Sequence, residues 1–206
     1  MSYPRPTKIV CVGRNYLEHA RELGNEMPER PMLFLKPPSS LIGDGEAILL
    51  PPESQRVEHE AELAVVISRR ARRVTADEAL EYVAGYLPLN DVTARDLQKL
   101  DVQFTRAKGF DTFCPMGKMV PADGVDPSAL DVICRVNGEV RQRGNTREMA
   151  FSVPVLIEYI SNVMTLEAGD VIATGTPAGV GPLMDGDEVE VEVVGVGTLR
   201  NPVRAR

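Results

Sequence analysis

The sequence contains no tryptophan, two histidines and three cysteines in 206 residues. The cysteines, Cys11, Cys114 and Cys134, are odd in number and form no C-x-x-C pair, which disfavours a disulfide framework and a structural zinc site. This usage favours a reducing, cytoplasmic compartment. The chain also lacks an apolar run near the roughly 18 residues of a membrane helix, and its first residues form no apolar signal segment.

Positive charge is also scarce, because 23 Lys and Arg residues face 30 Asp and Glu residues, for a net charge of −7. A nucleic-acid-binding protein normally carries a basic stripe. The one basic run, residues 69–73, is interpreted as a solvated turn after a strand. Hydrophobic residues make up 43% of the chain and charged residues 26%, which is typical of a folded globular protein. We therefore expect neither a nucleic acid nor a membrane as partner.

The 16 prolines and 17 glycines indicate many turns and a β-rich chain. Hydrophobic patterning predicts strands at residues 9–12, 32–35, 47–50, 58–67, 85–90 and 187–194, and a hairpin in 132–140 that turns at Asn137-Gly138. Helices are predicted at 16–23 with Asn15 as cap and Gly24 as end, at 75–83 with a Thr75–Glu78 capping box, at 93–101 and at 152–163. The prediction is a single α+β domain, residues 1–206, in which strands dominate.

The densest chemical signal is the segment from Glu58 to Glu62. On a strand, Glu60 and Glu62 share a face, and two such carboxylates repel each other unless a cation lies between them. Oxygen ligands without cysteine favour Mg²⁺, Mn²⁺ or Ca²⁺. The alternative is a surface strand with two solvated acids, although this strand continues into a fully apolar run.

A further acid, Asp91, follows the strand predicted at 85–90, where ligand-binding loops are common. Nearby Arg95 could clamp a substrate carboxylate, or it could simply balance Asp96. His19 lies three residues before Glu22 on the helix predicted at 16–23, so the two share a face. A histidine held by a carboxylate can act as a general base, while the alternative is an incidental surface pair.

Three further segments carry candidate anion-binding groups. Lys36 follows an apolar strand, and Lys108 lies in the segment from Arg106 to Asp111. A lysine at a strand end can bind a carboxylate or an enolate as a point charge, although most lysines are only solvated. The glycine-rich turn from Thr174 to Gly181 could cradle an anion, but it lacks the Lys-Ser/Thr end of a P-loop.

Seven motifs occur in an order that resembles the fumarylacetoacetate hydrolase family. They are Gly13-Arg14-Asn15-Tyr16 with His19, Phe34-Leu35-Lys36-Pro37, His59-Glu60-Ala61-Glu62-Leu63, Asp91-Val92-Thr93-Ala94-Arg95-Asp96, Lys108-Gly109-Phe110, Val136-Asn137-Gly138-Glu139 and Thr174-Gly175-Thr176-Pro177. The match runs from about Ile9 to near the C-terminus. Within the family, the chain is similar to the small acylpyruvase, oxaloacetate decarboxylase and hydroxyheptadienedioate isomerase branch.

This resemblance implies a roll of packed mixed β-sheets with short helices and a homodimeric assembly. It implies that one Mg²⁺ or Mn²⁺ is held by Glu60, Glu62 and Asp91. It also implies a catalytic pair of His19 and Glu22 on a helix that can act as a lid, and a Lys108 that contacts substrate oxygens. Candidates for the substrate-binding wall are Arg14, Arg95, Gln98 and Thr176.

The implied substrate is a small keto acid. We expect a divalent-metal-dependent hydrolase that cleaves the C–C bond of 2,4-diketo acids such as acetylpyruvate or fumarylpyruvate, by way of an enolate that the metal stabilises. Oxaloacetate decarboxylation and isomerisation of 2-hydroxyhepta-2,4-diene-1,7-dioate use the same enolate and remain alternatives. A non-catalytic metabolite-binding protein is the most remote alternative. We expect no extra N-terminal domain, and the stretch between Asp91 and Lys108 is shorter than in the acylpyruvase branch, which leaves the substrate open.

Overall fold

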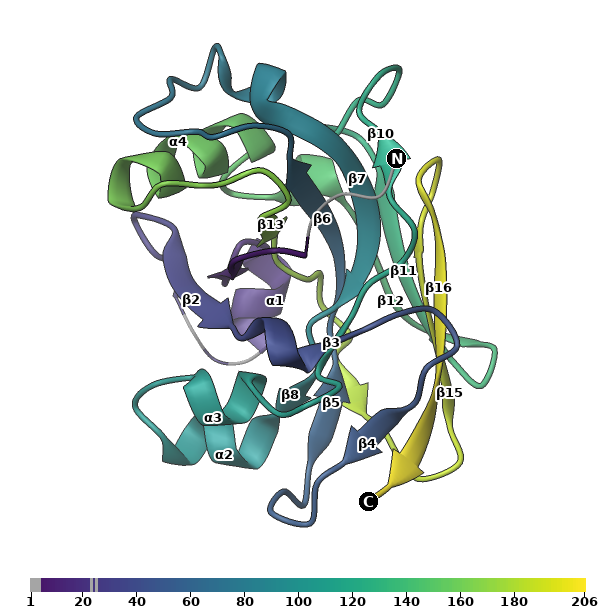
Figure 1. The fold of residues 1–206 in the computed structure, drawn as a ribbon. Helices are drawn as coiled ribbons and strands as arrows, with labels where there is room; N and C mark the ends of the chain where they lie inside the picture. The colour runs from purple at the N-terminus through teal and green to yellow at the C-terminus, as the bar shows by residue number, and fades with distance from the viewer. Residues whose placement is uncertain (1–4, 23, 25) are drawn as a thin grey trace.

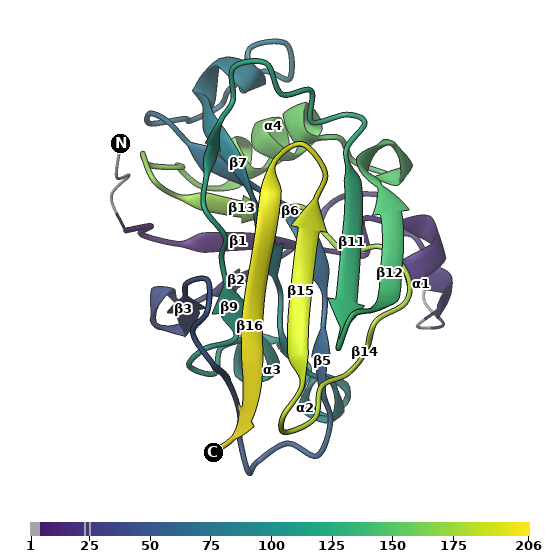
Figure 2. The ribbon, with the colours of Figure 1, turned by 90° about the vertical axis from the view of Figure 1, so that its right-hand side faces the viewer.

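The computed structural model describes residues 5–22, 24 and 26–206, and two sheets form most of it (Figure 1). The larger sheet has six strands, in the order β10 (Val120–Pro121), β7 (Val83–Asn90), β6 (Ala61–Ile67), β13 (Val171–Ala173), β1 (Ile9–Gly13) and β2 (Met32–Lys36). The second sheet has five, in the order β12 (Glu139–Asn145), β11 (Asp131–Val136), β15 (Glu188–Val193), β16 (Gly197–Ala205) and β4 (Ile48–Leu50), and Figure 2 views it face-on.

Smaller elements complete the fold. A three-stranded sheet runs β14 (Gly181–Pro182), β5 (Val57–His59) and β8 (Thr93–Ala94), and β3 (Leu41–Ile42) pairs with β9 (Cys114–Pro115). The α-helices are α1 (Leu17–Glu22), α2 (Arg95–Leu100), α3 (Thr105–Lys108) and α4 (Val153–Val163), and the 3₁₀ turns are η1 (Pro38–Ser40), η2 (Ala79–Tyr82) and η3 (Thr146–Glu148). This is the predicted β-rich roll of mixed sheets with short helices.

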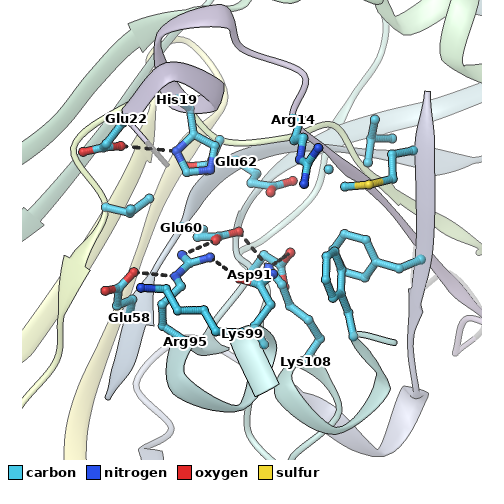
Figure 3. A pocket seen from close by; sticks show the side chains of 18 of the residues that line it. Arg14, His19, Glu22, Glu58, Glu60, Glu62, Asp91, Arg95, Lys99 and Lys108 are labelled. Atoms are coloured by element: carbon cyan, nitrogen blue, oxygen red, sulfur yellow. Dashed lines mark hydrogen bonds and ion pairs between the residues drawn. The ribbon is translucent and has the colours of Figure 1, made fainter. Parts of the chain in front are cut away.

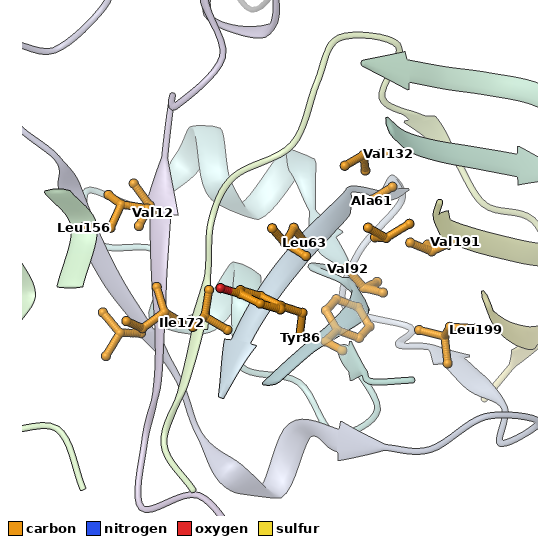
Figure 4. Close-up of a cluster of buried hydrophobic side chains, with 14 of the residues drawn as sticks. Val12, Ala61, Leu63, Tyr86, Val92, Val132, Leu156, Ile172, Val191 and Leu199 are labelled. Carbon is orange, nitrogen blue, oxygen red and sulfur yellow. The ribbon is translucent and has the colours of Figure 1, made fainter. Parts of the chain in front are cut away.

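Strand β6 is buried on both faces, and its one charged residue is Glu62. Leu63 belongs to the main core, together with Tyr86 of β7 and with Val191 and Leu199 of the second sheet (Figure 4). Ala64 contributes to a separate cluster on the opposite face of the larger sheet. Because side chains alternate along a strand, residue 62 shares the face of Ala64 and turns away from the second sheet.

Two predicted elements were wrong in detail. The strand predicted at 58–67 is two strands, because β5 pairs with β8 and β14 whereas β6 pairs with β7 and β13, and Glu60 lies at the break. The helix predicted at 75–83 is a turn followed by η2. The side chain of Thr75 bonds the Glu78 side chain instead of capping backbone N–H groups. Val83 already belongs to β7, so the segment closes in one tight turn.

The helix predicted at 93–101 begins only at Arg95, because Thr93 and Ala94 form β8, and the predicted cap of α1 is also wrong. The remaining predictions agree with the structure. The hairpin turns at Asn137-Gly138, both with positive φ, as a two-residue turn with these residues requires. Asn15 does not cap α1; its side chain bonds the backbone of Phe151 and Thr174. All three cysteines are free and buried. In the described residues, no helix has the length and apolar character needed to cross a membrane.

Candidate functional site

Three buried carboxylates converge where β6 and β7 meet. Glu60 lies at the break before β6, Glu62 lies on β6, and Asp91 follows β7 directly. Antiparallel pairing of the two strands places Ala61 opposite Asn90, and the backbone N–H of Asp91 donates to the carbonyl of Glu60 at 2.9 Å. Their carboxylates therefore offer oxygen atoms that all lie within 4.8 Å of one another (Figure 3).

Three buried cations contact two of these carboxylates. The Lys108 ammonium, at the end of α3, donates to Glu60 Oε2 at 2.8 Å and to Asp91 Oδ2 at 2.7 Å. Lys36, at the end of β2, donates to Asp91 Oδ1 at 2.5 Å and to the carbonyl of Val92 at 3.0 Å. Arg95, at the start of α2, donates to Glu60 Oε1 at 2.5 Å. Glu60 and Asp91 are thus each held from two sides.

Glu62 differs from the other two carboxylates. Its oxygen accepts a hydrogen bond from the Gly175 N–H at 2.8 Å, and no cation among the described residues pairs with it. Burial, and then the charges of Asp91 and Glu60, raise the pKa of Glu62 well above its usual range. Burial alone would also raise the pKa of Glu60, but Lys108 and Arg95 hold it below its ordinary value. The cluster therefore favours one more cation, and its three carboxylates fit a hard divalent ion.

His19 and Glu22 lie on α1 beside the carboxylate cluster (Figure 3). Nδ1 of His19 is 3.3 Å from Glu22 Oε2, so the predicted pair is in contact. The N–H of Gly179 donates to both Glu22 oxygens at 3.1 Å, which ties α1 to the loop before β14. A side chain that fixes one ring nitrogen of a histidine leaves the other free for proton transfer.

The predicted wall residues have different surroundings. Gln98 Oε1 accepts from Arg95 Nη1 at 2.6 Å, so its amide N–H groups remain available as donors. The Thr176 hydroxyl donates to the carbonyl of Ala61 at 2.8 Å and accepts from Gln142 at 2.7 Å, so its proton is already used. Arg14 has a φ of 56°, a strained left-handed conformation of a kind often found at functional sites.

These groups line one cavity of about 510 Å³. All ten predicted site residues lie on its wall, together with Val12, Gly13, Met32, Phe34, Arg56, Glu58, Lys99, Phe104 and Val180. Lys99 was not predicted, although it lies four residues after Arg95, where residues share a helix face. Glu58 was missed as well, despite alternating with Glu60 and Glu62. The sequence marked Lys36 as a possible carboxylate binder but could not predict Asp91 as its partner, because the contact joins residues 55 positions apart.

Residues 8–204 match the family model described as fumarylacetoacetate hydrolase C-terminal. The chain belongs to the fumarylacetoacetate hydrolase family. Glu60, Glu62 and Asp91 form a cluster that could hold a divalent ion, and a solved structure from this family contains Mn²⁺.

Three relatives in this family carry three different activities in their names. A mitochondrial oxaloacetate decarboxylase of Dictyostelium discoideum is 46% identical over 93% of this chain and 90% of its own length. The structure of 2-hydroxyhepta-2,4-diene-1,7-dioate isomerase from Mycobacterium marinum is 46% identical, with a TM-score of 0.91 over 98% of this chain and 76% of the other. Fumarylpyruvate hydrolase from Pseudomonas aeruginosa, in complex with Mn²⁺ and pyruvate, is 30% identical, with a TM-score of 0.94 over 100% and 92% of the two chains. The family identifies an enzyme, and these names span three reaction classes.

Proposed function

We propose that this enzyme decarboxylates oxaloacetate with a bound divalent ion. The observation that carries the proposal is the charge pattern of the cavity, which joins a buried carboxylate cluster to two cations, Arg14 and Lys99, that have no acidic partner among the described residues. Such a cavity suits a keto acid with two carboxylates, such as oxaloacetate or fumarylpyruvate, better than acetylpyruvate, which has one. The named decarboxylase also shares more of this sequence than the named hydrolase does.

Glu60, Glu62 and Asp91 would hold the ion. When bound, a divalent ion acts as a Lewis acid that draws electron density from the oxygens of a keto acid. Two of these residues keep fixed positions through Lys108, Lys36 and Arg95, as their hydrogen bonds indicate. A preorganised set of this kind does not have to rearrange when the substrate arrives.

The residues of the chain account for the movement of charge and protons. When the C3–C4 bond of oxaloacetate breaks, C4 leaves as carbon dioxide and the electron pair remains on the enolate of pyruvate. The buried Lys108 ammonium lies on the cavity wall, where it can stabilise negative charge on the enolate oxygen. His19 would then deliver a proton to C3, which yields pyruvate, with Glu22 holding its Nδ1.

Arg14 and Lys99 would attract the dianionic substrate. The protein as a whole carries a net charge of −7 and repels anions at long range, so local cations at the cavity matter for binding. Figure 3 places Arg14 on one side of the carboxylate cluster and Lys99 on the other, beside Arg95. A cation on the departing carboxylate stabilises the bound substrate more than the product, so we expect these residues to lower KM.

The test is turnover of oxaloacetate and acetylpyruvate side by side, on EDTA-treated protein with and without added Mg²⁺. The proposal expects Mg²⁺-dependent release of carbon dioxide and pyruvate in equal amounts from oxaloacetate, well above a protein-free Mg²⁺ blank. Glu62→Gln should abolish this activity, while the exposed Glu139→Gln, which makes the same charge change on β12, should retain it. Loss of acetylpyruvate alone, or turnover equal to the blank, would refute the proposal.

Hydrolysis of acylpyruvates is the second candidate, and the contact between His19 and Glu22 favours it. A histidine held in this way could activate a water molecule against the 4-carbonyl group. His19→Ala should then abolish acetylpyruvate hydrolysis and leave Mg²⁺ binding intact by calorimetry. Retained hydrolysis in this variant would remove the water-activating role. A 2-hydroxyhepta-2,4-diene-1,7-dioate sample in the same assays tests isomerisation.

A further inference from the structure

Glu58 is a buried acid that lies outside the carboxylate cluster. It belongs to β5, and its side chain is 2% exposed. One oxygen accepts from Arg95 Nε at 2.7 Å (Figure 3), and the other accepts from Arg56 Nε at 2.6 Å. These two contacts place Glu58 behind Arg95, on the side away from the proposed metal ligands.

Arg95 connects Glu58 to the rest of the site. Its three donor groups are all in use, because Nε bonds Glu58, Nη2 bonds Glu60 at 2.5 Å and Nη1 bonds Gln98 at 2.6 Å. Its side chain is 4% exposed, so water cannot substitute for a lost partner without rearrangement. One guanidinium charge is thus shared between two carboxylates and also fixes the amide of Gln98.

We propose that Glu58 is a positioning residue that preserves the negative charge of Glu60 for a divalent ion. Lys108 already contacts Glu60, so a second undivided positive charge from Arg95 would compete with the ion for the same carboxylate. By binding the other edge of Arg95, Glu58 takes up part of that charge. It also keeps Arg95 oriented so that Gln98 presents its amide N–H groups to the cavity.

Calorimetric titration of EDTA-treated protein with Mn²⁺ alone tests the proposal without any substrate. Glu58→Gln keeps the shape and an acceptor for Arg95 but removes the charge. It should raise the Kd for Mn²⁺ by about tenfold, a typical effect of losing a partner behind a metal ligand. The matched control is Glu139→Gln, which changes an exposed residue whose one ion pair among the described residues is with Arg141; it should leave the Kd unchanged. A Kd within twofold of the wild type in Glu58→Gln would overturn the proposal.

A double-mutant cycle shows whether Glu58 acts through Arg95. In the Arg95→Gln background, Glu58→Gln should change the Kd for Mn²⁺ by less than twofold, because the charge that Glu58 offsets is gone. A tenfold weakening that persists in this background would mean that Glu58 acts directly or by general damage to the fold, and would overturn the proposal.

Two further measurements apply if Glu58→Gln does not fold, and they distinguish a failure of this proposal from a failure of the proposed reaction. Glu58→Asp keeps the charge and should bind Mn²⁺ within threefold of the wild type, so a tenfold loss in this variant would contradict the charge argument even if Glu58→Gln does not fold. At saturating Mn²⁺, Glu58→Gln should recover most of kcat, whatever keto acid is turned over. If no keto acid is turned over but the Kd changes as expected, the proposed reaction fails and the role of Glu58 stands.

Discussion

Replacement of Lys108 by methionine gives the sharpest test of how the site is held together. The Lys108 side chain is 2% exposed, and its ammonium joins two carboxylates at 2.8 and 2.7 Å. Burial alone would lower the pKa of Lys108, but Asp91 and Glu60 raise it above the ordinary value, so the cation is strongly favoured. Methionine keeps much of the volume and removes the charge, which leaves two buried carboxylates facing each other.

The expected cost follows from the buried ion pairs. Breaking a buried pair by removing one partner typically lowers the free energy of unfolding by about 3–5 kcal/mol. Lys36 and Arg95 still neutralise part of the charge, so we expect about 3 kcal/mol for Lys108→Met. For a chain of this length, that loss corresponds to a fall of roughly 6–12 °C in Tm. The loss should shrink when a divalent ion supplies the missing positive charge.

The assay is urea unfolding and thermal melting in EDTA and in excess Mg²⁺. In EDTA, Lys108→Met should be less stable than the wild type by the stated amount. Mg²⁺ should raise the Tm of the variant more than that of the wild type, because the ion no longer competes with an ammonium. The exposed Lys99→Met is the control and should change stability by less than about 0.5 kcal/mol. A variant that is as stable as the wild type in EDTA, or that gains less from Mg²⁺, would refute the reasoning.

Three further predictions concern residues that support the fold around the site and a lysine on the cavity wall. Burial opposes ionisation of Asp170, but hydrogen bonds from backbone N–H groups and from Lys8 outweigh this effect and lower its pKa. Asp170→Asn should therefore lower the free energy of unfolding by about 2 kcal/mol at pH 7. Urea unfolding at pH 3 should show a smaller loss. At Gly179, φ is 98° and an added Cβ would lie 2.2 Å from the carbonyl of Arg141, so Gly179→Ala should lower both Tm and turnover. Lys99→Met should raise the KM for oxaloacetate several-fold at low salt and much less at 0.5 M NaCl, because salt screens exposed charges.

The sequence was most informative where chemistry depends on neighbours along the chain. Alternation predicted that Glu60 and Glu62 share a face, and helix spacing predicted that His19 reaches Glu22. The sequence was least informative about where a strand ends. The strand through Glu60 breaks because its two halves pair with different partners, and such pairing joins residues far apart in sequence.

The buried cations show a second limit of local patterns. Lys36 looks like a polar stop at the end of an apolar strand, yet its ammonium is fully buried against Asp91. Glu58 looks like the exposed start of the same acidic run that supplies the metal ligands, yet it is buried against Arg95. Burial of a charge depends on a partner supplied by another element, so no periodicity within one strand can predict it.

The charge balance of the site predicts the order in which a divalent ion and an anionic substrate bind. Four buried carboxylates, Glu58, Glu60, Glu62 and Asp91, lie among three buried cations, Lys36, Arg95 and Lys108. The more exposed Arg56 also contacts Glu58, so the ionised charges balance. A divalent ion held by Glu60, Glu62 and Asp91 would add two positive charges to this balance. The floor of the cavity then becomes positive in a protein whose net charge is −7. An anionic keto acid would be drawn to that floor only after the ion, so we expect metal binding to precede substrate binding, with little binding of oxaloacetate by EDTA-treated protein in calorimetry.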